Sequence, residues 1–178
     1  MTDILENLRG GDLRSIGCAN EVAHEVEKNS ALFGAVFSGL YDSDPVVRMR
    51  SADVIEKVTK SKPELLSGYT SQVMSILASA EQQEICWHMA QVSPRLECTE
   101  SEETELIESL KKLLLHKSKI VRVSAMDSLA ILAERNSSIL NEVIEIIKVQ
   151  KETGSPAVQA RGRKLLKRLG GKQTNVKT

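Results

Sequence analysis

The side chains best suited to chemistry in this sequence are arginines, carboxylates and one tryptophan that recur at regular spacing. Four arginines could together bind an anion or a nucleic-acid backbone: Arg48, Arg50, Arg122 and Arg161. Carboxylates lie one or two helical turns from them, so we expect structural ion pairs instead. The expected acceptors are Asp42, Asp44, Asp53 and Asp127.

No residue pattern indicates catalysis, a metal site or a cofactor site. Cys86 and His88 lie about 200° apart around one helix, so they do not converge on one ion. Gly10-Gly11 and Gly170-Gly171 lack the strand-to-helix context and the lysine of phosphate-binding loops. We therefore expect a protein that is not an enzyme and needs no cofactor.

A repeated phrase places these side chains on helices. It begins at Val47, Ile85, Val121 and Val158, about every 37 residues. In the first copy, apolar and small residues recur at helical spacing over residues 45–60, and Asp44-Pro45 supplies an N-cap and a proline at the first helical position. Such a period predicts stacked helix pairs.

The helix pairs divide the chain into residues 1–29, 30–62, 63–99, 100–136 and 137–170 of a single domain, followed by a disordered tail at 171–178. Asp12 is expected to cap a helix over 12–27 in an atypical N-terminal pair. Ser101 is expected to cap the first helix of the fourth pair, and Gly170-Gly171 to end the last helix.

Composition and charge narrow the class of protein. The 41% hydrophobic content and 3% aromatic content favour an all-α fold filled by aliphatic side chains. Net charge is zero, but residues 81–108 are acidic and residues 148–178 are basic, which predicts a dipolar molecule. An odd cysteine count, with no secretory or membrane-spanning pattern, leads us to expect a cytoplasmic protein without disulfides or membrane contact.

At the four repeated segments the chain resembles HEAT repeats, and residues 42–52 match best, with Asp42, Val47, Arg48 and Ala52 at the positions of the pattern Asp-x-x-x-x-Val-Arg-x-x-Ala-Ala. The later copies lack the aspartate. The resemblance, which spans about residues 12–169, implies a right-handed α-solenoid of about five helix pairs, related to armadillo-like folds. It also implies that the second helix of each pair lines a concave surface. Proteins with such repeats serve diverse functions, so the resemblance specifies the fold more strongly than the function.

On that surface, the outermost positions of the first copy are expected to be Met49, Asp53, Glu56 and Lys60. The equivalent positions of the other copies add an apolar row to Met49 and a polar row to Asp53. Together the two rows form the predicted partner-binding face: Met49, Trp87 and Val123, and Asp53, Gln91, Asp127 and Lys164. Trp87 would be its anchor. In the alternative interpretation, Met49, Trp87 and Val123 seal the seam between neighbouring helices. A basic patch at the end of the chain comprises Arg161, Arg163, Lys167 and Arg168, and a solvated helix end is the favoured interpretation of it.

The leading hypothesis is a scaffold or adaptor that binds a protein or peptide partner along the concave face. The alternative is a nucleic-acid-binding protein similar to the HEAT-like DNA alkylation repair glycosylases, with Trp87 and Asp53 or Asp127 in the site. Neutral charge and few aromatic residues disfavour it. A likeness to the repeats of bilin-lyase proteins has no support beyond repeat style. We expect a monomer or a weak, head-to-tail homo-oligomer.

Overall fold

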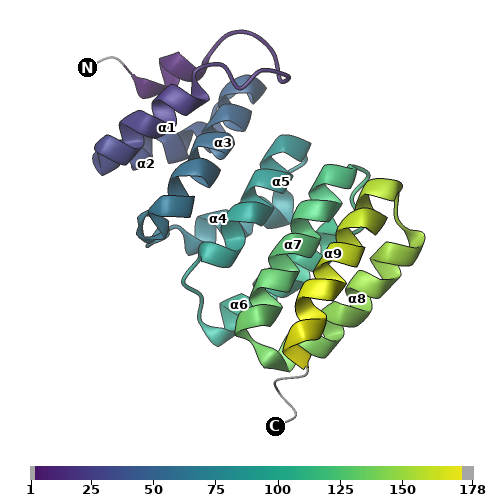
Figure 1. The fold of residues 1–178 in the computed structure, drawn as a ribbon. Coiled ribbons are helices and arrows are strands. Elements are labelled where there is room, and N and C mark those ends of the chain that lie inside the picture. The colour runs from purple at the N-terminus through teal and green to yellow at the C-terminus, as the bar shows by residue number, and fades with distance from the viewer. Residues whose placement is uncertain (1–2, 174–178) are drawn as a thin grey trace. The chain divides into compact units, whose positions relative to one another are not determined.

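The computed structural model describes residues 3–173, and these residues form an all-helical protein without strands (Figure 1). The predicted all-α class is confirmed. The α-helices are α1 (Ala19–Lys28), α2 (Phe33–Ser38), α3 (Pro45–Ser61), α4 (Thr70–Ser79), α5 (Gln83–Val92), α6 (Glu100–Leu113), α7 (Lys119–Arg135), α8 (Leu140–Thr153) and α9 (Pro156–Gln173). The 3₁₀ segments are η1 (Ile4–Leu8), η2 (Ser30–Leu32), η3 (Gly39–Tyr41), η4 (Pro63–Leu66), η5 (Ser93–Arg95) and η6 (Ser137–Ile139).

The chain divides into two compact units. Unit 1 comprises Met1–Thr99 and unit 2 comprises Glu100–Thr178. Their boundary coincides with the boundary predicted between the third and fourth helix pairs.

Helix α3 is the centre of unit 1. Its start follows the sequence: the Asp44 side chain accepts a hydrogen bond of 2.8 Å from the Val46 backbone N–H, and Pro45 is the first helical residue. The apolar side of α3, which includes Val47 and Val54, is fully buried. The helix packs against α1, α2 and α5, while α4 packs on α5. With three neighbouring helices, α3 retains little exposed surface.

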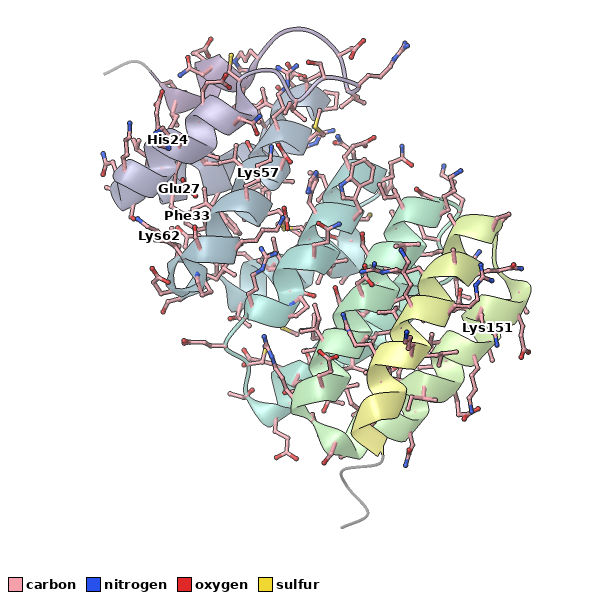
Figure 2. The ribbon with its side chains drawn as sticks, in the orientation of Figure 1. His24, Glu27, Phe33, Lys57, Lys62 and Lys151 are labelled. Atoms are coloured by element: carbon pink, nitrogen blue, oxygen red, sulfur yellow. The ribbon has the colours of Figure 1, made fainter. Side chains whose placement is uncertain are left out.

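Polar contacts also join α3 to α1 (Figure 2). Lys57 donates to Asn20 Oδ1 at 2.6 Å, and Lys62 donates to the backbone carbonyl of Glu27 at 2.5 Å. The partners are separated by more than thirty residues in the sequence. These contacts fix the pairing of the two helices in addition to their apolar packing.

The N-terminal part of unit 1 differs from the prediction. Asp12 does not cap a helix over 12–27, because residues 9–18 form a loop and α1 begins only at Ala19. Asp12 instead accepts a 2.8 Å hydrogen bond from the Arg14 backbone N–H within a turn. Arg50 on α3 donates hydrogen bonds to the carbonyls of Leu8, Arg9 and Ser15. These bonds satisfy backbone carbonyls of the segment without helical hydrogen bonds.

Unit 2 consists of α6 to α9. Helix α7 packs against α6, α8 and α9, and α8 packs against α9. The core contains fully or almost fully buried side chains from every helix: Leu106, Leu110, Leu129, Ile147 and Leu165. Close approach of α8 and α9 depends on Gly162, where an added Cβ atom would lie 2.9 Å from the Cβ of Lys151 (Figure 2).

Three helix boundaries differ from the sequence prediction. In the predicted pair over 63–99, the first helical segment is divided into η4 and α4. Helix α6 begins at Glu100, so Ser101 lies in the first turn instead of capping it. Helix α9 continues through Gly170 and Gly171 to Gln173, because glycine lowers helix stability without preventing a helix. The rest of the predicted tail, residues 174–178, lies outside the described residues.

None of the helices in the described part of the chain is long and apolar enough to span a membrane.

Candidate functional site

The predicted partner-binding residues of unit 1 lie on α3 and α5. Met49 is 4% exposed and Asp53 is 7% exposed, so the prediction that they are outermost is wrong, as it is for Glu56. The neighbouring helices α1 and α5 cover both flanks of α3 and explain this burial. Trp87 and Gln91 on α5 remain partly exposed. The burial of Met49 agrees with the alternative in which it seals a seam.

The buried carboxylates of α3 are all engaged within unit 1. Asp53 accepts a 2.6 Å ion pair from Lys57, which lies one helical turn further on the same helix. Glu56 accepts from Lys60 and from Arg95, each at 2.9 Å. Two cations therefore compensate the Glu56 charge, and one compensates the Asp53 charge. Burial alone raises the pKa of Glu56, but the hydrogen bonds from Lys60 and Arg95 outweigh it and leave that pKa lowered.

Arg95 connects three acceptors on α3. Besides the Glu56 carboxylate, it donates at 2.8 Å to the Glu56 backbone carbonyl and at 2.8 Å to Thr59 Oγ1. Thr59 in turn donates to the carbonyl of Ile55. The segment after α5 is thus held to α3 by a partly buried, charge-assisted network.

His88 is buried in the same part of unit 1 and was not predicted to be part of a site. It is 9% exposed, and its Nδ1 has no hydrogen-bond partner among the described residues. Burial lowers the pKa of His88, while the nearby carboxylates of Asp53 and Glu56 act in the opposite direction. Its ring centroid lies 5.3 Å from that of Trp87. Within the described chain, no group of three or more potential ligands could hold a metal ion.

In unit 2, some residues of the predicted partner-binding face and of the basic end patch also form ion pairs. Asp127 accepts a 2.5 Å ion pair from Arg161, and Glu134 accepts a 2.8 Å ion pair from Arg168. Two of the four residues in the predicted basic end patch are therefore compensated. The other two, Arg163 and Lys167, are exposed, as is Lys164, while Val123 is partly exposed.

Of the four arginines that could together bind an anion, Arg48, Arg50 and Arg122 donate to backbone carbonyls or side-chain amides. Arg48 donates to Gln82 Oε1 at 2.9 Å and to the carbonyls of Asp42 and Ser43. Arg50 is 3% exposed and donates only to backbone carbonyls, and Arg122 donates to Gln150 Oε1 at 2.6 Å. Among the described residues the expected ion pair forms for Arg161 alone, and the expectation is wrong for Arg48, Arg50 and Arg122, which bind carbonyl or amide oxygens instead.

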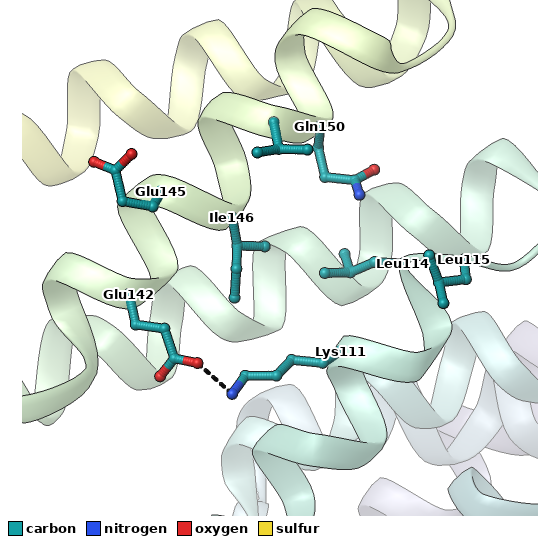
Figure 3. Close-up of a pocket in the computed structure, with 8 residues that line it drawn as sticks. Lys111, Leu114, Leu115, Glu142, Glu145, Ile146 and Gln150 are labelled. Atoms are coloured by element: carbon teal, nitrogen blue, oxygen red, sulfur yellow. Dashed lines mark hydrogen bonds and ion pairs between the residues drawn. The ribbon is translucent and has the colours of Figure 1, made fainter.

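Unit 2 also contains an open groove of about 690 Å³ between the end of α6 and helix α8 (Figure 3). Its surface is mainly apolar, with Leu115 85% exposed and Val149 54% exposed. Its lining residues are Lys111, Leu114 and Leu115 at the α6 end, and Glu142, Glu145, Ile146, Val149 and Gln150 on α8. We call this feature the α6–α8 groove.

The rim of the α6–α8 groove is charged. Lys111 pairs with Glu142 across the groove (Figure 3). It also pairs with Glu108 at 2.7 Å. Glu145 pairs with Lys148 at 2.7 Å. These three carboxylates face two ammonium groups, so the rim carries one excess negative charge. An apolar floor with an acidic rim suits the binding of an apolar segment that carries a positive charge.

Comparison of the sequence with protein-family models and with curated proteins gives no match in either set. The resemblance to HEAT repeats therefore depends on the repeated residues themselves.

Sequence reasoning did not identify the α6–α8 groove, although the sequence contains a signal for it. The main apolar stripe of α8 is formed by Val143, Ile144 and Ile147, which are buried. Ile146 and Val149 lie off this stripe and three residues apart, which places a second apolar pair on the otherwise polar side. Leu115 likewise follows the end of α6, beyond its buried stripe.

Proposed function

We propose that this chain is a HEAT-like α-solenoid of about five helix pairs that acts as a non-enzymatic protein-interaction module. The helix contacts within each unit support it. In unit 1, α3 contacts α1 and α5, and in unit 2, α7 contacts α9. These are the second helices of successive predicted pairs, and each also packs on a first helix, as stacking of the pairs requires.

The observation that carries the interaction function is the α6–α8 groove with its exposed Leu115. An isolated exposed apolar residue is ordinary, but four apolar side chains lining one open groove form a surface that association with a partner would bury. Full burial of a leucine or valine side chain contributes about 1.5–3 kcal/mol. Leu115 is 85% exposed and Val149 is 54% exposed, so a partner that covers them recovers part of this free energy.

The occupant that fits this groove is a protein segment with apolar side chains on one side and a lysine or arginine beside them. The apolar side chains would contact Leu115, Ile146 and Val149. The basic side chain would lie near Glu142 and Glu145, whose side chains are exposed at the rim. This proposal moves the binding surface from the second helices to the first helices α6 and α8, because Met49 and Asp53 are buried whereas Leu115 and Val149 are exposed.

The nucleic-acid alternative receives no specific support from the contacts. Arg48, Arg50, Arg122 and Arg161 each donate to an acceptor in this chain. A phosphate backbone would have to displace those acceptors. Titration of duplex DNA at low salt tests this alternative, and binding of the duplex would favour it over the interaction module.

Binding of a short amphipathic helical peptide, with leucines on one face and lysines at its border, tests the proposed groove. We expect the fluorescence anisotropy of the labelled peptide to rise with protein concentration. Leu115→Glu should weaken binding about tenfold or more, because it places a carboxylate in the apolar floor. A peptide with glutamates in place of the lysines should bind less well than the original.

Ile120→Glu is the matched control. Ile120 is a 44% exposed aliphatic residue of the same unit that does not line the groove. It should leave peptide affinity unchanged. Equal affinity of wild type and Leu115→Glu, or an equal loss in both variants, would contradict binding in the groove.

A further inference from the structure

The loop of residues 9–18 in unit 1 presents a second set of exposed apolar side chains. Leu13 is 40% exposed and Ile16 is 43% exposed. Between them lies Arg14, whose side chain is 93% exposed and makes only a long, 3.8 Å ion pair with Asp12. The turn from Asp12 to Ser15, closed by a 3.3 Å backbone hydrogen bond, places Leu13 and Arg14 at its two central positions.

Hydrogen bonds from Arg50 of α3 fix the conformation of this loop. The buried guanidinium of Arg50 donates to the carbonyls of Leu8, Arg9 and Ser15, at 2.8, 3.0 and 3.1 Å. Gly17 has a φ of +50°, and a Cβ atom there would lie 2.6 Å from the Arg50 guanidinium carbon. A loop fixed in this way loses little conformational entropy when it binds. Its exposed side chains are thus preorganised for recognition.

The chemistry of this loop matches that of the α6–α8 groove. The loop offers two aliphatic side chains with a cation between them, and the groove offers an aliphatic floor with an excess of carboxylates on its rim. We propose that the loop of one copy of this chain binds the α6–α8 groove of a second copy. Leu13 and Ile16 contact Leu115 and Val149, and Arg14 faces Glu142 and Glu145. This inference rests on the proposed function, because it names the partner of the same groove.

The two surfaces are different, so the contact is head-to-tail. Each copy offers both a loop and a groove, so such a contact builds closed rings or open chains. Two aliphatic side chains and one ion pair form a small interface. We expect a dissociation constant on the order of 0.1–1 mM. Salt should weaken the contact, because Arg14 and the rim carboxylates are exposed.

Two complementary variants test the contact without uncontrolled chain growth. The groove variant Leu115→Glu keeps its loop, and the loop variant Leu13→Glu/Ile16→Glu keeps its groove. Each alone should remain monomeric at millimolar concentration. When they are mixed, the loop of the groove variant should enter the groove of the loop variant, and a one-to-one dimer should form that does not extend.

Heteronuclear NMR detects such weak binding. Adding unlabelled loop variant to labelled groove variant should shift the amides of residues 12–17. Adding unlabelled groove variant to labelled groove variant should leave these amides unshifted. Adding Arg14→Glu to the groove variant should weaken its binding to the loop variant about tenfold. Absence of shifts in the mixture, or shifts confined to residues outside the loop, would overturn the proposal. All substituted positions are exposed, so the variants should fold.

The leucine–lysine peptide separates this inference from the proposed function. If that peptide binds wild type and not Leu115→Glu while the mixed variants stay monomeric, the groove binds a different partner and the self-association is wrong. If neither the peptide nor the loop binds, the proposal that the α6–α8 groove is a binding site is wrong.

Discussion

Replacing Arg95 with methionine should destabilise unit 1 by about 3 kcal/mol. Arg95 donates one charge-assisted hydrogen bond to the Glu56 carboxylate and two hydrogen bonds to neutral acceptors. A charge-assisted bond contributes about 1.5–3 kcal/mol and a neutral one about 0.5–1.5 kcal/mol. Loss of one partner from a fully buried ion pair costs about 3–5 kcal/mol. We expect the lower end of that range, because Lys60 remains bound to Glu56.

Urea unfolding followed by tryptophan fluorescence measures this loss. Trp87 is the sole tryptophan and lies on α5, in the same unit as Arg95, so its emission reports the unfolding of that unit. Lys60→Met is the matched control. It removes the other cation of Glu56, but its side chain is 60% exposed, so the cost should be about 0–1 kcal/mol. A loss below about 0.5 kcal/mol for Arg95→Met, typical of surface substitutions, would refute the reasoning.

The pH dependence of stability provides a second measurement of the same network. The folded-state pKa of Glu56 is lowered from its ordinary value of 4.5, so the folded state binds its proton less readily than the unfolded state. This stabilisation is present above pH 4.5 and is lost as the pH falls through the lowered pKa. Arg95→Met removes one of the hydrogen bonds that lower this pKa, and it should therefore reduce the slope of stability against pH below 4.5.

Three further predictions concern other parts of the chain. Because burial lowers the pKa of His88 from 6.5, the unfolded state takes up the His88 proton first, and stability should fall as the pH drops below 6.5. Replacing His88 with leucine should remove this slope from an acid titration of stability, and an unchanged slope would contradict the assignment to His88. Asp44→Ala should cost about 1 kcal/mol in urea unfolding through loss of the N-cap, and no loss would contradict that role. Leu110→Ala should cost about 2–5 kcal/mol, whereas Leu115→Glu should change thermal stability little, and an equal cost would show that Leu115 is part of the core.

Local sequence signals predicted the helices well where the controlling contacts are also local. Helix α3 begins where Asp44 and Pro45 place it, because the N-cap hydrogen bond spans only two residues. The loop before α1 is different. Its conformation depends on Arg50, more than thirty residues away, and no local pattern around Asp12 contains that information.

The predicted binding surface differed from the structure for a related reason. A helical projection places Met49 and Asp53 on the side of α3 opposite Val47. The prediction assumed that this side is exposed because it lies opposite the apolar stripe. A helix with neighbours on three sides buries those positions as well. How many neighbours a helix has is a property of the tertiary fold. The sequence therefore predicted the periodicity of α3 and missed the extent of its burial.

Charge pairing explains why a binding surface is better sought away from the repeated phrase. Asp53 and Asp127 occupy equivalent positions of the predicted pairs, and both are ion-paired: Asp53 with Lys57 on the same helix, and Asp127 with Arg161 on α9. A partner that bound them would have to replace an existing ion pair, and such an exchange gains little free energy. Glu142 and Glu145 at the groove rim are ion-paired in the same way, so the gain at the groove comes from covering Leu115 and Val149, whose exposed surface contributes little to folding. A partner such as the proposed one would therefore gain more free energy by covering the apolar floor of the α6–α8 groove than by binding the ion-paired rows.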